Sequence, residues 1–196
     1  MSENNTPWTV LTAAHEALRT AVQGVPADAW DRPTPCDQWT VTQVLQHAAG
    51  DQLGFAAFIT GGPGPEENPF APSGRIDGSP ADLAENSMRA SAAAWATIAP
   101  DAAEVPVPVP PNKLPAEVGA AACALDAAVH AWDIAVATGQ PSPLTSELAR
   151  GLQPALAIVE PLRAYGAYAT ALEEQPGDDD AAKLLRFLGR RPDWTA

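Results

Sequence analysis

The chain has 196 residues, a net charge of −13 and 46% hydrophobic residues. This is enough apolar material for one domain with a sizeable core, and it argues against a disordered chain. The negative charge makes nucleic acid and anionic membrane surfaces poor partners, because both would repel the protein.

No segment of the sequence reads as a membrane anchor or a secretory signal. Apolar runs stay short of the roughly 20 residues that span a bilayer, and the first ten residues lack a basic stretch followed by an apolar core. Cys36 and Cys123 lie far apart and form no CxxC pair, so a reduced compartment is the simplest fit. We therefore expect a single domain over residues 1–196, located in the cytoplasm and without membrane partners.

The first predicted helix covers about residues 7–23. Thr6 is its expected N-cap, followed by a proline at the first helical position, where the missing N–H has no cost. His15 lies off the centre of the apolar stripe of this helix, and we interpret it as a surface residue. Residues 24–39 then form a proline-rich connection.

The second predicted helix covers residues 40–61. Thr40 and Gln43 fit a capping box at its start, and a glycine ends it. His47 lies near its middle. The Gly/Pro-rich residues 61–79 follow, and we expect them to form a loop that could be a flap over a site.

A third and a fourth helix are separated by a second proline-rich segment. Ser79 and the proline after it open the third helix, which we expect to end near residue 100. Residues 100–115 read as extended chain that cannot be a central strand, because proline donates no ladder hydrogen bond. Residues 115–139 form the fourth helix, ended by Gly139.

The remaining chain predicts a broken helix and a short terminal one. Residues 142–165 are interrupted by Pro154 and Pro161, so we expect a kink or a break there. Residues 178–189 form the last helix, with aspartates at its N-terminal end. No convincing alternating strand pattern is present. The predicted fold is all-α, a bundle of four long helices with a short C-terminal helix.

The fourth predicted helix carries three ionisable residues among small apolar ones. At about 100° per residue, Asp126, His130 and Asp133 fall within a sector of roughly 60°. Ionisable groups on a buried face must be paired, neutralised or bound to a metal. The Asp126–His130 spacing fits either two metal ligands or a plain hydrogen-bonded pair.

His47 favours the metal interpretation, because it is a second interior histidine on another long helix. Inward side chains from facing helices of a bundle build three-ligand centres of this kind. Three protein ligands leave positions open for water or substrate, which is the catalytic pattern. The candidate ligands are therefore His47, Asp126 and His130.

Two blocks, TPCDQWTVTQVLQHAAGD and ALDAAVHAWDIAVATG, resemble the mycothiol-dependent maleylpyruvate isomerase N-terminal, or DinB-like, metal-binding family. The tail LLRFLGRRPDW resembles an uncharacterised actinobacterial branch of it. The resemblance implies a DinB-like four-helix bundle with a divalent metal, zinc or alternatively nickel, held by His47, Asp126 and His130. This chain departs from the isomerase-like enzyme of that family in two features. The enzyme has glutamate in the position of Asp126, and it has a further C-terminal domain that contributes to its active site.

Four other residues invite a functional interpretation beside a structural one. Asp133 and Asp51 are candidates for holding a histidine N–H, against an ordinary hydrogen bond and a solvated carboxylate, respectively. Cys123 lies a turn before Asp126 and could add a thiolate, although we favour simple packing. Cys36 reads as structural.

The leading functional hypothesis is a metal- and thiol-dependent transferase or isomerase. A bound metal would activate a small thiol such as mycothiol towards an electrophilic substrate. The alternatives are a non-catalytic metal-binding or regulatory bundle protein, and a bundle in which the Asp126–His130 pair is purely structural. A homodimer is compatible with the sequence, but no interface is specified by it.

Overall fold

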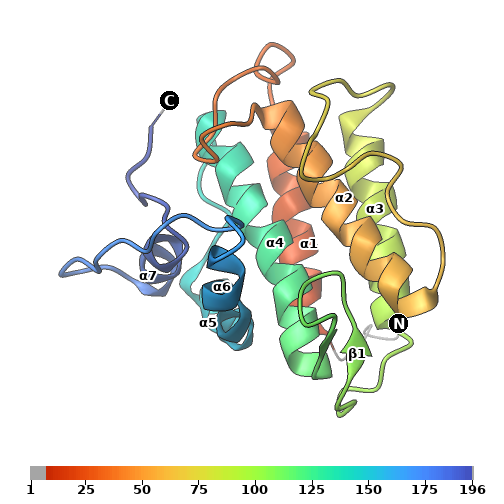
Figure 1. The fold of residues 1–196 in the computed structure, drawn as a ribbon. Coiled ribbons are helices and arrows are strands. Elements are labelled where there is room, and N and C mark those ends of the chain that lie inside the picture. The colour runs from red at the N-terminus through yellow and green to blue at the C-terminus, as the bar shows by residue number, and fades with distance from the viewer. Residues whose placement is uncertain (1–7, 196) are drawn as a thin grey trace, which may run out of the picture.

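The computed structural model of the protein describes residues 8–195 (Figure 1). These residues form seven α-helices, one 3₁₀ helix and one two-stranded sheet, so the all-α prediction is confirmed. The elements in chain order are α1 (Thr9–Gln23), α2 (Val41–Thr60), α3 (Pro80–Trp95), β1 (Val105–Pro106), β2 (Lys113–Leu114), α4 (Ala116–Ala137), α5 (Ser146–Gly151), η1 (Gln153–Ala155), α6 (Leu156–Arg163) and α7 (Asp180–Phe187).

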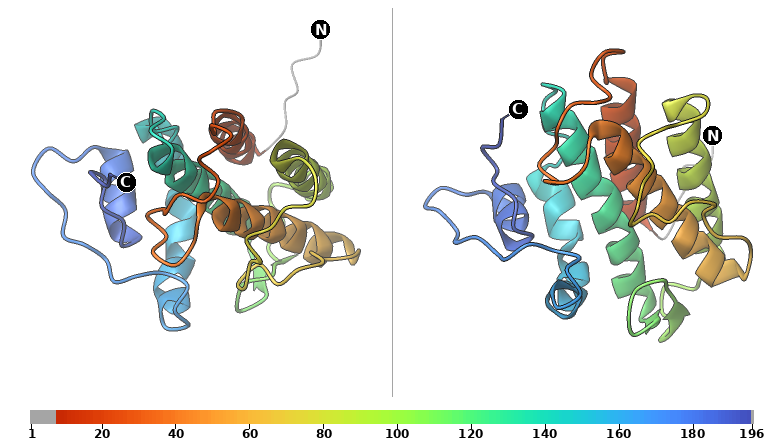
Figure 2. Two further views of the ribbon diagram at one scale, coloured as in Figure 1. Left: turned by 90° about the horizontal axis from the view of Figure 1, so that it is seen from above. Right: turned by 45° about the horizontal axis from the view of Figure 1, so that its top comes forward.

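The four long helices make a bundle. Helix α1 packs against α4 and α3, and α2 packs against α3 and α4, so the four helices form a closed ring, seen from above in the left panel of Figure 2. The shorter helices α5, α6 and α7 lie beside α4, on the side away from α3 (Figure 1). Helix α4 is thereby enclosed by both groups.

Enclosure of α4 is possible because its side chains are small. Alanine dominates the helix, which favours helix formation and lets neighbouring helices approach closely. By length and composition α4 could cross a membrane, contrary to our expectation that no segment has that length, but 89% of its most apolar window is buried inside the protein. The helix therefore has the burial of a core helix.

Capping signals in the sequence set the start of two helices as predicted. The Thr40 side chain accepts a hydrogen bond from the Gln43 backbone N–H, and the Gln43 side chain accepts one from the Thr40 N–H. The Ser79 side chain caps α3 by accepting a hydrogen bond from the Asp82 backbone N–H. Gly61 ends α2 with φ of 71°, a left-handed conformation that glycine adopts without strain.

Other boundaries differ from the predictions. Helix α1 begins at Thr9, while the predicted cap Thr6 and the proline after it lie outside the described residues. Helix α3 ends at Trp95 rather than near residue 100. Thr145, whose side chain accepts from the Leu148 N–H, caps the start of the fifth helical segment, which is later than predicted.

Two effects of proline were predicted for the second half of the chain: a kink or break in residues 142–165, and an extended segment over residues 100–115. The structure shows the break at one of the two prolines and a short pair of strands in the extended segment. The fifth helical segment is broken near Pro154 into α5, η1 and α6, whereas Pro161 is accommodated inside α6. The segment 100–115 turns back on itself, and β1 pairs antiparallel with β2. Pro106 is tolerated there because a two-stranded ribbon leaves one side of each strand without a ladder partner.

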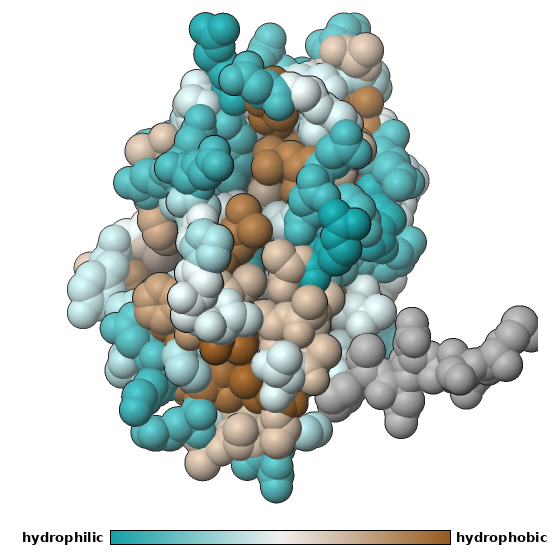
Figure 3. Space-filling model, turned by 90° about the vertical axis from the view of Figure 1, so that its right-hand side faces the viewer, coloured by the Kyte–Doolittle hydropathy of each residue, from teal (hydrophilic) through white to brown (hydrophobic). Residues whose placement is uncertain are grey.

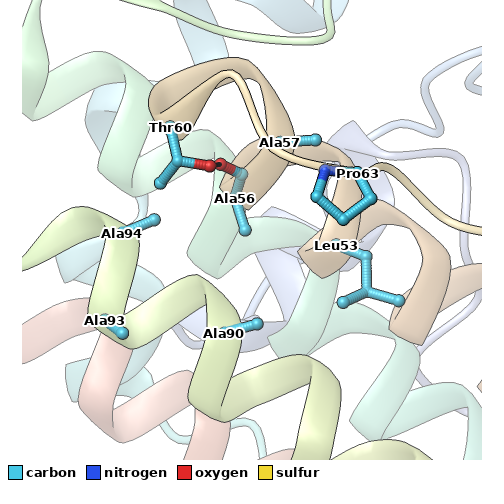
Figure 4. Close-up of a pocket in the computed structure, with 8 residues that line it drawn as sticks. All are labelled: Leu53, Ala56, Ala57, Thr60, Pro63, Ala90, Ala93 and Ala94. Atoms are coloured by element: carbon cyan, nitrogen blue, oxygen red, sulfur yellow. Dashed lines mark hydrogen bonds between the residues drawn. The ribbon is translucent and has the colours of Figure 1, made fainter.

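A shallow groove lies between α2 and α3, on the side of the bundle opposite α5–α7. Figure 3 shows the right-hand face of the molecule, where apolar residues gather among hydrophilic ones. The groove has a volume of about 370 Å³ and is lined by Leu53, Ala56, Ala57, Thr60, Pro63, Ala90, Ala93 and Ala94 (Figure 4). None of the three candidate metal ligands lines it.

The prediction that His15 lies on the surface is wrong. The residue is 5% exposed, and its Nε2 lies 2.8 Å from Oε1 of Gln52, a carbonyl oxygen that can only accept. The Gln52 amide donates in turn to the Cys123 backbone carbonyl at 3.0 Å. This polar chain links α1, α2 and α4, and its partner residues were not visible from the apolar stripe of α1 alone.

Replacing His15 by glutamine should remove a pH dependence of stability. Burial lowers the pKa of His15 below its ordinary value of 6.5, so the folded protein keeps the ring neutral where the unfolded chain binds a proton. The stability that depends on this neutral ring is complete above about pH 6.5, and it declines below that by at most about 1.4 kcal/mol per pH unit. Urea unfolding at about pH 7.5 and about pH 5.5 should show a larger loss for the wild type than for His15→Gln. An equal loss in both proteins would contradict a buried neutral ring.

Candidate metal centre

The three predicted ligands come together between α2 and α4. His47 extends from the middle of α2, while Asp126 and His130 lie one turn apart on α4. Both histidine Nε2 atoms lie 3.4 Å from Oδ1 of Asp126. One potential ligand atom from each residue falls within 4.8 Å of the others, a grouping that could hold a metal ion.

The ring of His47 is oriented by the loop that follows α2. Its Nδ1 lies 3.0 Å from the backbone carbonyl oxygen of Pro69. Because a carbonyl oxygen can only accept, Nδ1 carries the proton and donates it. In the neutral ring Nε2 then has a free lone pair, and this atom is the one that faces Asp126.

The ring of His130 is oriented by Asp133, one turn further along α4. The Nδ1 atom donates to Oδ2 of Asp133 at 2.9 Å. Burial alone would raise the pKa of Asp133, but the Arg190 guanidinium and His130 hold it below its usual range, so this carboxylate is ionised. Asp133 therefore holds the Nδ1–H of His130, which is the role considered for it from the sequence. The other ring nitrogen, Nε2, faces Asp126.

Asp126 contributes the feature that fits a cation most clearly. Its Oδ2 atom is buried and has no hydrogen-bond partner among residues 8–195. Burial opposes ionisation of this carboxyl, yet His130 and His47 lower its pKa. Burial likewise disfavours a charged His130, but Asp126 and Asp133 raise its pKa to about 10. The carboxylates therefore favour positive charge at the Nε2 atoms, which a proton or a metal ion can supply.

Asp51 lies at the edge of this group. Its Oδ2 is 3.9 Å from Nε2 of His47, and its side chain is 18% exposed. Burial, with the negative charge of Asp126 next, raises the pKa of Asp51 to about 7. It faces the Nε2 side of His47, so it does not hold the Nδ1 proton, and it is more enclosed than the solvated carboxylate that we favoured from the sequence.

A covering layer encloses His47 from the solvent side. We call residues 61–79 the cover loop. Phe70 from this loop meets the His47 ring edge-on with centroids 5.4 Å apart, and Trp39 lies over the ring at 4.7 Å. The position of the cover loop is thus consistent with the flap expected from the sequence.

The cover loop is fixed to α2 by polar side chains next to His47. Gln43 donates to the Pro72 carbonyl at 3.2 Å. Gln46 donates to the Ser73 hydroxyl at 2.9 Å and to the Arg75 carbonyl at 3.0 Å, and accepts from the backbone of the loop. One face of α2 therefore holds both the candidate ligand and the loop that covers it.

The two cysteines lie near the centre without joining it. Cys123 forms hydrogen bonds with Ser91 and Gln52, and burial raises the pKa of its thiol to about 12. It therefore packs as a neutral thiol, as we favoured. Cys36 is half-buried, and burial raises its pKa although the positive charge of His130 acts in the opposite direction.

Arg190 is the contact that the sequence analysis missed. It follows α7 and reaches Asp133 with two hydrogen bonds. The tail LLRFLGRRPDW was noted for its resemblance, but neither periodicity nor spacing relates a residue there to one on α4. The only signal was the pair of arginines after a helix-ending glycine.

Comparisons with known proteins match most of the chain. A family described as "Mycothiol maleylpyruvate isomerase N-terminal domain" matches residues 11–135, which include all three candidate ligands and Asp133. Two uncharacterised proteins of Mycobacterium tuberculosis, one from each of two strains, are 31% identical over 183 residues. The alignment covers 90% of this chain and 93% of each relative. No solved structure matches the chain.

Two glycines of α2 should respond oppositely to alanine. A Cβ at Gly50 would lie 2.7 Å from Cγ and 2.9 Å from Cβ of Pro69, so Gly50→Ala should displace the Pro69 carbonyl from His47. A Cβ at Gly54 meets only Pro108, at 3.8 Å, and alanine there should stabilise the helix by up to about 1 kcal/mol. Urea unfolding measures stability, and the proton NMR signal of His47 Nδ1–H reports the hydrogen bond.

We expect that signal to shift or exchange faster in Gly50→Ala and to stay unchanged in Gly54→Ala. An equal gain of stability in both variants, with the His47 signal unaltered, would contradict the role assigned to Pro69.

Proposed function

The chain belongs to the mycothiol maleylpyruvate isomerase N-terminal domain family, and from this premise we propose that it is a metal-dependent protein of thiol chemistry. In this proposal His47, Asp126 and His130 hold a divalent metal, zinc in the first place and nickel as the alternative. The co-substrate is a small thiol such as mycothiol, and the second substrate is an electrophile. The reaction is a transfer of the thiol, or an isomerisation through a transient thiol adduct.

The observation that carries the proposal is the convergence of the Nε2 atoms of His47 and His130 on the Asp126 carboxylate. Both imidazoles use Nδ1 for a hydrogen bond within the protein, which leaves the two Nε2 atoms directed at Asp126, where a metal ion could replace a proton. The partnerless Oδ2 of Asp126 adds a negatively charged oxygen. Two nitrogens and one carboxylate form a donor set that suits zinc, and three protein ligands leave room for a further one.

A divalent metal held by His47, Asp126 and His130 would supply Lewis acidity, which lowers the pKa of a thiol. The residues of the chain contribute orientation and a dry environment. Asp133 accepts the Nδ1 proton of His130 and so fixes the orientation of that ring, and the Pro69 carbonyl does the same for His47. Trp39 and Phe70 cover the His47 ring and exclude water from one side.

We infer a small thiol as co-substrate from the family and from the open ligand position. The reaction of the whole isomerase is not part of this proposal. The family match covers residues 11–135, which the family describes as an N-terminal domain. Asp126 is one methylene shorter than the glutamate implied by the resemblance, which alters the reach of that ligand. We therefore propose thiol activation as the shared step and leave the electrophile undefined.

A second candidate, a non-catalytic metal-binding or regulatory protein, is favoured by the enclosure of the site. His47 and His130 are each 7% exposed, and the cover loop lies over His47. A thiol and an electrophile would need the cover loop to move before they reached the metal. A retained or sensed ion needs only slow exchange through that loop.

Removing a ligand should abolish metal binding without unfolding the protein. Untagged wild type should contain close to one equivalent of divalent metal by elemental analysis. His130→Ala should lose more than about 100-fold in zinc affinity, since loss of a supporting residue alone costs about 10–100-fold. His15→Gln, another buried histidine outside the group, should bind zinc as the wild type does.

Circular dichroism must show unchanged helix content in these variants. Metal-free wild type that cannot be loaded with zinc, nickel or cobalt would contradict the metal centre. Equal affinity in wild type and His130→Ala would exclude this site as the place of binding.

A thiol should perturb the metal-loaded protein if the centre activates thiols. Cobalt-substituted wild type should gain sulfur-to-metal charge-transfer absorption when mycothiol is added, and thiol conjugation to an electrophile should follow. Cobalt-loaded protein that responds to no thiol would reject thiol activation. A spectral response without turnover against a panel of electrophiles would favour the non-catalytic candidate.

A further inference from the structure

Arg190 makes a two-pronged ion pair with a carboxylate in the core. Its Nε donates to Oδ1 of Asp133 at 2.9 Å, and its Nη2 donates to Oδ2 at 2.8 Å. The Asp133 side chain is fully buried, and that of Arg190 is 12% exposed. Parallel hydrogen bonds of this kind fix the plane of a carboxylate as well as its position.

The same carboxylate orients a candidate metal ligand. Oδ2 of Asp133 accepts a hydrogen bond from Nη2 of Arg190 at 2.8 Å, and it also accepts one from Nδ1 of His130 at 2.9 Å. The guanidinium therefore controls where Oδ2 lies, and Oδ2 controls the rotation of the His130 ring. Through two hydrogen bonds Arg190 determines the direction of the Nε2 atom that faces Asp126.

The backbone after α7 is shaped to deliver Arg190 to this position. Gly189 adopts φ of 81°, and a Cβ there would lie 2.7 Å from Cβ of Ala169 and 2.9 Å from the Thr170 carbonyl oxygen. The Arg190 N–H closes the turn by donating to the Leu185 carbonyl at 2.8 Å. The chain can therefore turn from α7 towards α4 only with glycine at this point.

We propose that Arg190 is a positioning residue of the metal centre, by which the segment after α7 sets metal affinity through Asp133 and His130. The inference rests on the metal-binding half of the proposed function. It adds a residue from outside residues 11–135, the part matched by the family. A purely structural link between α4 and the segment after α7 would need only the ion pair. Here Oδ2 of Asp133 accepts from both Arg190 and the His130 ring.

The test compares Arg190→Gln and Arg190→Lys with the control Arg191→Gln, an exposed arginine in the same segment. Zinc affinity is measured by competition with a chromophoric chelator on the full chain. We expect Arg190→Gln to bind zinc about 10–100-fold more weakly than the wild type. Lysine supplies charge without the fork, so Arg190→Lys should be intermediate, and Arg191→Gln should match the wild type.

Two further readouts separate positioning from a purely structural role. The proton NMR signal of His130 Nδ1–H should shift or exchange faster in Arg190→Gln, while the melting temperature of Arg191→Gln and its His130 signal stay unchanged. In a double-mutant cycle, Asp133→Asn should leave little additional effect for Arg190→Gln on zinc affinity, because both act on one ring. Additive losses with an unshifted His130 signal would overturn the proposal.

The outcomes also distinguish this inference from the proposed function. Wild type that binds no divalent metal would overturn both. Wild-type zinc affinity retained in Arg190→Gln and Arg190→Lys would overturn only the role of Arg190. If Arg190→Gln does not fold, Arg190→Lys decides, and an affinity within about twofold of the wild type would overturn the inference, against the loss expected for a supporting residue.

Discussion

Burial of the Asp126 carboxylate between two imidazole rings is the constraint on which the rest of the structure depends. A charged group inside a helical bundle is stable only if opposite charge and hydrogen bonds surround it. Here His47 and His130 supply the neighbours, each at 3.4 Å, and one carboxylate oxygen has no partner among the described residues. The small side chains of α4 allow the helices to approach closely enough for this arrangement.

The candidate centre is supported by parts of the chain that are far apart in sequence. The cover loop fixes the His47 ring through the Pro69 carbonyl, and the segment after α7 reaches the His130 ring through Asp133. The Nδ1–H of each ring is therefore held by a group that contributes no ligand atom itself. These orienting groups affect metal affinity, because they define the positions of the residues that would bind the metal.

The contacts that enclose the candidate centre limit how a substrate could reach it. The groove between α2 and α3 is lined mostly by small apolar residues and by none of the candidate ligands, so the candidate metal centre does not open into this groove. The candidate ligands lie beneath aromatic side chains and a hydrogen-bonded loop. Access to a metal held there, and hence the choice between thiol catalysis and simple metal retention, depends on how readily the cover loop opens.

The sequence alone determined the helical class, some helix ends and the three residues that converge, because caps, periodicity and buried ionisable side chains are local signals. Capping at Thr40 and the one-turn spacing of Asp126 and His130 are examples. Only the tertiary structure decided that His15 is buried against Gln52 and that Arg190 reaches α4. These contacts join distant parts of the chain, and their residues follow no local pattern, so packing of the whole fold was needed to bring them together.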